Sequence, residues 1–531
     1  MSTRLRGLTT GAAGLTRLGL RTGGIGLLLI VVVAAGLVTL TAASIAVLYD
    51  DPGERLVYAE TIGASPAALA FNGRGYGLET IGGISALEVG FMGQLLFPLL
   101  AMHVAVKHTR REEEAGRTEV LTAGQVGRLA PLASGAILLA GTCLAICALM
   151  LTGLVAVGVP TAASAWYATS VALVMAFFGA AGLLLGQLAQ SARTAYLMGL
   201  GLLTGVYLLR ALVDGLGWDA VWLSPLGWLP EVRAFAEPQA WPLLAYAASG
   251  AALLTGAVVI ARGRDLGAGV LTPRPGPARA RPTLATVPGL TWRMMQGPTL
   301  TWTVIAVLWA ACFGALSQEM SELIDANPNL VEALGVGSGV DIVTSLAVVV
   351  ICLAATAVAA QGAGRLSTEE SSGRLGALLA TRVPRLRLWL GWWAVVTALS
   401  LAVLALGTAS LGLATWAVTG DSAAVGHALG VGAGYAVPVA FVAAVAALLG
   451  AAAPQLAGLI WLLVGWIVVV GFLAETLRLP GWARDLSPLH LVGTLPREDP
   501  ALTAVLGLGA GAVVAFAVSA LTIRRRDLRA G

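Results

Sequence analysis

The sequence predicts an all-α polytopic membrane protein with about twelve transmembrane helices in two repeated six-helix halves. Of the 531 residues, 57% are hydrophobic and only 11% are charged, whereas about 25% of an average soluble domain is charged. Apolar stretches of roughly 20 residues, long enough to cross a bilayer as helices, recur along the chain. Charged segments of the first half return in the second half at nearly constant spacing.

The expected spans divide equally between the halves, six in each. Their limits follow the apolar stretches and are soft by a few residues, because charged and aromatic residues at the interface blur the ends of a span. In the first half the spans run over 24–48, 84–106, 132–157, 163–188, 195–213 and 241–261. In the second half they run over 300–316, 342–360, 388–418, 425–452, 456–474 and 501–522.

The distribution of basic residues predicts the orientation. Most of the 32 basic residues fall in segments that are cytoplasmic if the N-terminus is inside, and Lys and Arg near membrane helices are retained on the cytoplasmic side. Both termini are therefore expected in the cytoplasm, with the chain in a bacterial plasma membrane and its spans against lipid. The net charge of +4 reflects this orientation, so no nucleic-acid partner is expected.

Four segments are expected along the chain. Residues 1–23 mix leucine with arginine, as a helix lying in the inner headgroup plane would, and they form an elbow helix. Residues 24–269 form the first six-helix half. Residues 270–299 form a cytosolic linker rich in proline and arginine, which cannot be helical throughout, followed by a second elbow. Residues 300–531 form the second half.

A charged motif between the second and third spans of each half is the strongest functional signal. The first copy holds Glu112, Glu113, Gly116 and Arg117, and identical residues stand at a constant offset in the second copy. Those counterparts are Glu369, Glu370, Gly373 and Arg374.

Apolar residues that follow each motif at helical spacing predict a short amphipathic helix in water. This helix either rests on the membrane surface or docks onto a protein. Its presence at the same place in both halves favours a twofold-symmetric partner. The apolar residues are Val120, Leu121, Val126 and Leu129 in the first copy, and Leu378, Leu379, Val383 and Leu386 in the second.

Two further repeats support the duplication. A basic segment at the end of the first half, 262–269, returns as 524–531. A Leu-Ser-Pro-Leu sequence at 223–226 returns at 486–489, near the start of the last span in each half. Each half therefore repeats the same order of elements.

The motif Glu-Glu-x-x-Gly-Arg after the second span of a six-helix unit resembles the ABC-2 type exporter permeases of actinobacteria. It is most similar to the fused twelve-span permeases associated with export of tetronasin-type polyketide antibiotics, and the resemblance covers nearly the whole chain. The resemblance implies that the motif loops are coupling helices that sit in a groove of an ATP-binding subunit. The copies differ where Glu119 meets Gly376, so one docking contact is expected to be weaker.

The sequence holds no nucleotide-binding motif of its own. A P-loop needs glycines before a Lys-Ser or Lys-Thr pair, whereas Lys107 is followed by His108 and lacks those glycines. ATP and Mg²⁺ are therefore expected on a separate ATPase subunit, and two docking helices predict two copies of it per permease chain. No catalytic, cofactor-binding or metal-binding residues are expected in this chain, because its cysteines and histidines lack ligand spacing.

Ionisable residues inside spans are candidates for the substrate pathway, because their burial in lipid is costly. Glu88 is expected near the outer end of the second span, where it either pairs within the protein or contacts substrate or protons. Arg210 and Asp214 are spaced as a helical ion pair at the outer end of the fifth span, which favours a structural role.

The sequence thus predicts the permease subunit of an ATP-binding-cassette exporter, moving hydrophobic or amphipathic, antibiotic-like or drug-like compounds. The alternative is a proton-coupled secondary drug transporter, which is also built of two repeated halves. It would need titratable groups near the midplane, and the second half has few. A membrane enzyme for a lipid-linked substrate is a third class and would need clustered acids on an outer loop, where Asp50, Asp51 and Glu54 lie, although acidic runs in such loops are usually solvated charge.

Overall fold

A computed structural model describes residues 7–61, 63, 66–122, 124–271, 278–318, 339–474 and 477–527. The chain divides into two compact units, Met1–Gly276 and Pro277–Gly531, and the division falls within the expected linker. Residues 1–6 of the expected elbow, 272–277 of the linker and 528–531 of the terminal repeat lie outside the described residues.

The described residues form an all-helical fold in which twelve helices are long and apolar enough to cross a membrane. The predicted number of spans is therefore confirmed, six of them in each unit. The helices are longer than the predicted spans at many ends because polar residues continue the backbone hydrogen bonding beyond the apolar core.

The first unit contains five continuous spanning helices and one broken span. The continuous ones are α2 (Ala12–Leu48), α9 (Ala130–Val157), α10 (Thr161–Leu188), α11 (Ala192–Gly215) and α12 (Trp241–Gly263). Shorter helices precede α9, namely α3 (Pro52–Thr61), α4 (Pro66–Asn72), α5 (Ile81–Glu88), α6 (Gly90–Lys107), α7 (Arg110–Glu114) and α8 (Arg117–Thr122).

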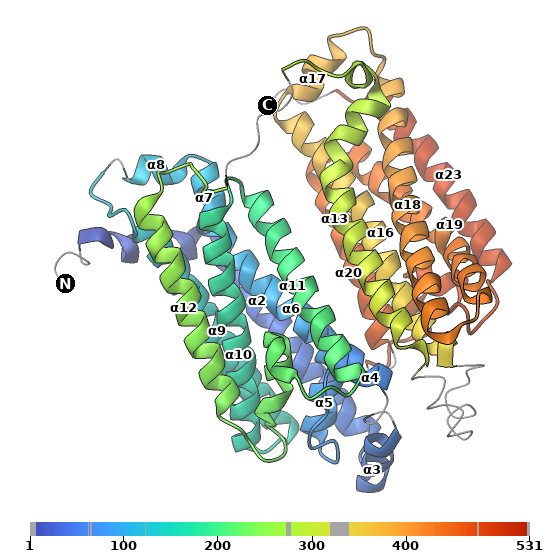
Figure 1. The fold of residues 1–531 in the computed structure, drawn as a ribbon. Helices are drawn as coiled ribbons and strands as arrows, with labels where there is room; N and C mark the ends of the chain where they lie inside the picture. Colours follow the sequence, from blue (N-terminus) through green and yellow to red (C-terminus); the bar gives the residue numbers. More distant parts are fainter. Residues whose placement is uncertain are drawn as a thin grey trace. The chain divides into compact units, whose positions relative to one another are not determined.

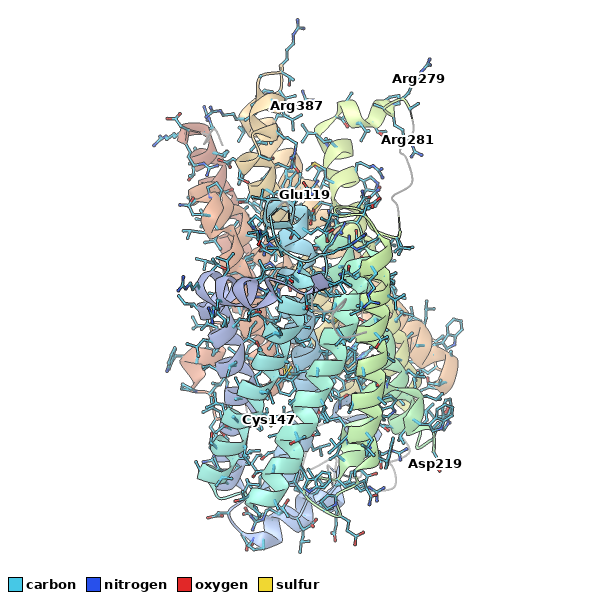
Figure 2. All side chains as sticks on the ribbon, turned by 90° about the vertical axis from the view of Figure 1, so that its left-hand side faces the viewer. Glu119, Cys147, Asp219, Arg279, Arg281 and Arg387 are labelled. Atoms are coloured by element: carbon cyan, nitrogen blue, oxygen red, sulfur yellow. The ribbon has the colours of Figure 1, made fainter. Side chains whose placement is uncertain are left out.

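Figure 1 shows that α7 and α8 lie at one end of the first unit, whereas α3, α4 and α5 lie at the other. Figure 2 likewise places Glu119 of α8 and Asp219 at opposite ends of this unit. The segments expected inside and outside the membrane are thus separated by the length of the helices. We refer to these as the inner and outer ends of the unit.

The second unit repeats the order of the first. After a short helix η4 (Pro282–Ala285), it contains α13 (Val287–Ala315), α16 (Gly339–Ser371), α18 (Arg385–Thr419), α19 (Ala423–Ala452), α20 (Ile460–Leu473) and α23 (Leu502–Arg525). The short helices α17 (Arg374–Leu379), η5 (Pro454–Leu459), α21 (Gly481–Arg484) and α22 (Pro488–Val492) connect them. In Figure 2, Arg279, Arg281 and Arg387 lie at one end of this unit.

Helix packing repeats with the sequence. In the first unit α2 packs on α9, and α10 packs on both α6 and α12. The corresponding helices of the second unit make the corresponding contacts: α13 packs on α18, and α19 packs on both α16 and α23. The internal repeat is therefore a repeat of tertiary structure within each unit.

Both expected elbows continue directly into spans. Residues 12–23 belong to α2, which begins after Gly11 in the left-handed conformation (φ 85°). Residues 289–293 belong to α13, whose first turn is capped by the Thr286 hydroxyl accepting from the Gly289 amide at 3.2 Å. An elbow and its span therefore share one hydrogen-bonded helix in each unit.

The second span of the first unit differs from the prediction. Residues 84–106 were expected to form one helix, but the chain breaks between α5 and α6 at Val89. The carbonyl of Asn72 lies so close to Gly90 that a Cβ at that position would stand 2.1 Å from its oxygen. The absence of a side chain at Gly90 lets the Asn72 backbone pack directly against the start of α6.

Candidate functional site

The motif loop of the first unit turns at Gly116, which has a positive φ of 73°. An exposed ion pair closes this turn, since Arg117 Nε donates to Glu112 Oε2 at 2.6 Å and Arg117 Nη2 donates to Glu112 Oε1 at 2.9 Å. The hydrogen bond that Arg117 donates to the Glu112 carboxylate raises the pKa of Arg117. The first glutamate and the arginine of the motif thus bind each other rather than a distant element.

The second glutamate of the motif is buried and binds the segment that follows the sixth span. Glu113 accepts from Arg264 Nη1 and Nη2, both at 2.6 Å, and from the Gly267 amide at 2.7 Å. Arg110 lies 3.1 Å from the same carboxylate. Bidentate, charge-assisted hydrogen bonds of this kind are the strongest that proteins form. They fix the motif loop to the end of α12.

Further bonds tie the loop to the turn between α10 and α11. Arg110, 1% exposed, donates to the carbonyls of Gln190, Gly267 and Ala268. Glu114 Oε2 accepts from the Ala192 amide at 2.9 Å, so it caps the N-terminus of α11 and interacts favourably with that helix dipole. The inner ends of spans four, five and six therefore converge on one loop.

The second unit builds the same arrangement from the second copy of the motif. Arg374 Nε donates to Glu369 Oε2 at 2.5 Å across a turn at Gly373, whose φ is 74°. Arg526 Nη2 donates to Glu370 Oε2 at 2.6 Å. The buried acid therefore binds an arginine after the sixth span in both units.

One more arginine contact repeats in both units. Arg128 donates to the carbonyl of Arg264 in the first unit, and Arg385 donates to the carbonyl of Arg526 at 2.9 Å in the second. In the second unit Ser367 also donates to the Pro454 carbonyl at 2.8 Å, in the turn after α19. The motif loop is thus attached at equivalent places in each half.

The predicted amphipathic stripe is wrong in both copies. Helix α8 ends at Thr122, so Val126 and Leu129 lie beyond it. Val120 is 77% exposed, whereas Leu129 is buried. In the second copy α17 ends at Leu379, so Val383 and Leu386 again lie beyond the helix. The αL glycine and the return of the chain to the next span shorten each helix to less than two turns.

The arginines that bind the motif acids were not among the site residues predicted from the sequence. Arg264 and Arg526 both lie in the basic segments that were recognised as a repeat. The feature of the sequence that could have pointed to these arginines is that each half contains both an acidic and a basic repeated segment. No local pattern indicates that the two segments contact each other, because more than 150 residues separate them.

Arg210 and Asp214 form the predicted helical pair, with Nη1 and Oδ2 3.6 Å apart and both side chains 1% exposed. Arg210 also donates to the carbonyls of Leu69 and Phe71, each at 2.9 Å. These carbonyls belong to the last turn of α4, where the Leu69 carbonyl also accepts from the Gly73 amide at 2.8 Å and the Phe71 carbonyl from the Tyr207 hydroxyl at 2.6 Å. Arg210 therefore holds α4 against α11.

A second arginine joins this pair to the outer loops. Arg74 Nε donates to Asp214 Oδ1 at 3.0 Å and Arg74 Nη1 lies 3.8 Å from Glu231. Tyr76 donates to Glu231 Oε1 at 2.6 Å, and Arg233 lies 3.1 Å from the other oxygen. Burial, assisted by Glu231, raises the pKa of Tyr76. We call Arg74, Tyr76, Arg210, Asp214, Glu231 and Arg233 the outer ionic cluster.

Glu88 ends α5 and accepts a hydrogen bond from the hydroxyl of Tyr58 in α3. This contact fits the first of the two interpretations made from the sequence, pairing within the protein.

Comparison with known proteins gives a family for this architecture. Residues 284–524 match the family model described as the C-terminal domain of the multidrug efflux system permease Rv1217c. Over 547 aligned positions the chain is 32% identical to the multidrug efflux system permease protein Rv1217c of Mycobacterium tuberculosis (strain ATCC 25618 / H37Rv). The alignment covers 98% of this chain and 96% of the relative. The chain belongs to this family of efflux permeases.

Membership of this permease family accords with the twelve spanning helices and identifies a multi-pass membrane transport protein. The family model covers only the second unit, whereas the similarity to the mycobacterial permease extends over both. The two anchored loops are thus part of a permease.

Proposed function

We propose that this chain is the membrane-spanning subunit of an ATP-binding-cassette exporter in the bacterial plasma membrane. It moves hydrophobic or amphipathic, antibiotic-like or drug-like compounds out of the cell. ATP and Mg²⁺ are bound and hydrolysed by a separate subunit, in two copies per permease chain, one at each motif loop. Resemblance of the motif to tetronasin-type exporters makes polyketide-like molecules a specific cargo class to examine.

The observation that carries the proposal is the attachment of each motif loop. Glu113 and Glu370 bind arginines that follow the sixth span of their units, so the acids recognised from the sequence face inward. The exposed residues of the short helices remain available to a partner. They include Val120 in α8 and Ala377 in α17.

This arrangement can transmit motion because it has little freedom to deform. A force on α8 acts through Glu113 on the end of α12 and through Glu114 on the start of α11. ATP-driven approach of two partner subunits would bias each unit between two states through these contacts. The acids of the motif therefore act as positioning residues behind the docking surface.

The experiment is co-purification of the full chain with a candidate P-loop ATPase from the same organism, followed by ATPase and drug-efflux measurements. Val120→Glu and Ala377→Glu place charge on the two exposed helix surfaces while leaving the anchoring ion pairs intact. Each is expected to weaken association by about tenfold or more, as loss of a central apolar contact does. Efflux should fall in parallel, since the two copies act together.

Leu56→Glu serves as the matched control, because Leu56 is also exposed, at 54%, but lies on α3 at the outer end. It should bind the ATPase normally. The proposal fails if both inner variants retain full association and efflux. Transport of a drug by purified permease alone, driven by a pH gradient, would instead establish the proton-coupled alternative.

A further inference from the structure

Two basic residues at the inner end of the first unit take no part in anchoring the motif loop. Lys107 is the last residue of α6 and Arg111 lies in α7, and we call them the inner basic pair. Neither side chain has an ion-pair or hydrogen-bond partner among the described residues. The three acids that follow, at 112–114, already bind Arg117, Arg264 and the Ala192 amide. The two positive charges are therefore uncompensated in the described part of the chain.

The Lys107 ammonium lies against α2, and the residue is half-buried. A Cβ placed on Gly26 would stand 3.3 Å from Lys107 Nζ, and one placed on Gly23 would stand 3.9 Å from it. Both glycines belong to the first spanning helix, at the start of its apolar stretch. A charge at the edge of the hydrocarbon is unfavourable unless it is hydrated or paired. The ammonium thus occupies a position at headgroup level, between α2 and α6.

Lys107 and Arg111 belong to one positive region. The charges of both act on His103, which lies one turn before Lys107 on α6. His103 stacks on Tyr196 of α11, with ring centroids 5.8 Å apart, and its Nδ1 lies 3.3 Å from the Tyr196 hydroxyl oxygen. The charge of Arg111 acts on Tyr196 as well. The region therefore extends from α2, across the inner end of α6, to the start of α11.

The inner basic pair has no counterpart in the second half. At the offset that relates the two motif copies, Gly364 and Thr368 stand where the first half has Lys107 and Arg111. The buried motif acids and the arginines that bind them are present in both units. Because the repeated fold and its anchored loops form in the second unit without this pair, the pair serves a purpose of the first unit alone.

The phosphate of an anionic lipid headgroup has the chemistry that fits this region. The cytoplasmic leaflet carries anionic lipids, and basic residues between membrane helices on that side bind their headgroups. Lysine binds a phosphate as a point charge, whereas the planar guanidinium of arginine can donate two parallel hydrogen bonds to it. A zwitterionic headgroup carries its own ammonium group, which two neighbouring cations repel. The region should therefore select a headgroup with net negative charge.

We propose that Lys107 and Arg111 bind the phosphate of an anionic phospholipid of the inner leaflet, beside α2 and α6 of the first unit. The phosphate supplies the negative charge that the described residues around the pair lack. The site gives the permease a lipid partner at one of its two units. Lipid binding requires neither ATP nor the ATPase.

Lys107 is the only lysine of the chain, so its amine can be followed without any substitution. The purified full chain is placed in nanodiscs of phosphatidylcholine that contain increasing amounts of phosphatidylglycerol with the same acyl chains. N-hydroxysuccinimidyl acetate then acetylates Lys107 and the terminal amine, and mass spectrometry gives both rates. We expect phosphatidylglycerol to slow acetylation of Lys107 relative to the terminal amine, saturably and by about fivefold, the effect of one basic residue at an anionic surface.

Arg111→Gln removes one of the two phosphate contacts and should abolish most of this protection. Arg262→Gln is the matched control, because Arg262 is also an exposed arginine at the inner end, in the last turn of α12. It should be protected as the wild type is.

Three outcomes would overturn the proposal. Equal slowing at the terminal amine would show a general effect of surface charge, and full protection in Arg111→Gln would show that the pair does not hold the lipid. Equal protection by inorganic phosphate, added to nanodiscs of phosphatidylcholine alone, would assign the site to a free anion. Because no ATPase is present, each of these results would leave the exporter proposal to its own test.

Discussion

Glu113 and Arg264 stand 151 positions apart in the sequence and form a two-pronged ion pair, with both N–O distances 2.6 Å. Glu370 and Arg526 repeat the relationship in the second unit, with a single bond of 2.6 Å. The motif acid of each half thus closes its six-helix unit by joining the loop after the second span to the residues after the sixth.

Glu113→Ala is expected to lower the free energy of unfolding of the first unit by about 3 kcal/mol, because it leaves buried Arg110 and Arg264 without their common partner. Unfolding of the purified chain in detergent measures this. Glu112→Gln is the matched change within the same motif. It should cost about 1 kcal/mol or less, since the Glu112–Arg117 pair is exposed. Equal losses for the two variants would contradict the anchoring role.

Glu370→Ala is expected to cost less than Glu113→Ala. Glu370 receives one bond from Arg526, and its Oε1 has no partner among the described residues, whereas Glu113 also binds Gly267 and Arg110. The same unfolding measurement on the two variants gives the difference. A larger loss of stability for Glu370→Ala would show that the number of hydrogen bonds to each acid does not determine its contribution to stability.

Gly116→Val should destabilise the motif turn through its backbone alone. The residue has φ 73°, and a Cβ there would meet no atom within 4 Å, so the cost is the left-handed conformation, about 1–2 kcal/mol for an L-residue. Gly373→Val should behave alike. Gly36 provides the comparison, because it lies within helix α2 and a Cβ there would also meet no atom within 4 Å. Gly36→Ala should therefore leave stability unchanged or raise it. If Gly116→Val left the free energy of unfolding unchanged, Gly116 would not need the left-handed conformation that the turn requires.

Gly90→Ala should prevent normal packing at the helix break, because its Cβ would stand 2.1 Å from the Asn72 oxygen. We expect a loss of folded protein, measured as the monodisperse fraction after purification in mild detergent. Gly141→Ala, a change in open space on α9, provides the comparison. If both variants purify equally well, the close approach of the 72–77 segment to α6 is not required for folding.

Arg210→Met should weaken the attachment of α4 to α11, since the carbonyls of Leu69 and Phe71 lose the guanidinium and Asp214 keeps only Arg74, while the Tyr207 hydroxyl still binds the Phe71 carbonyl. The expected result is faster tryptic cleavage after Arg74 in nanodiscs, because that side chain is already 25% exposed. Arg210→Lys should lie between the variant and the wild type, since a lysine can supply one of the two bonds. An unchanged rate of cleavage in Arg210→Met would contradict the conclusion that Arg210 holds α4 against α11.

The sequence by itself determined the number and order of the spanning helices, because lipid requires each backbone to satisfy its own hydrogen bonds within long apolar segments. It also identified both copies of the motif and the Arg210–Asp214 pair, which depend on residues at helical spacing. The interruption at Val89 was not predicted, since the composition of 84–106 is that of a continuous span, and the close approach of the Asn72 carbonyl to Gly90 is a tertiary contact.

Only the tertiary structure decided what the motif acids do. Local spacing suggested that Glu113 and Glu370 face a partner, whereas the fold brings them against Arg264 and Arg526 and buries them. The position of the Lys107 ammonium against Gly23 and Gly26 likewise arises where α2 and α6 pack together. Contacts between residues so far apart follow from how helices pack, which the hydrophobic pattern of a membrane chain constrains only weakly because lipid and protein interiors are equally apolar.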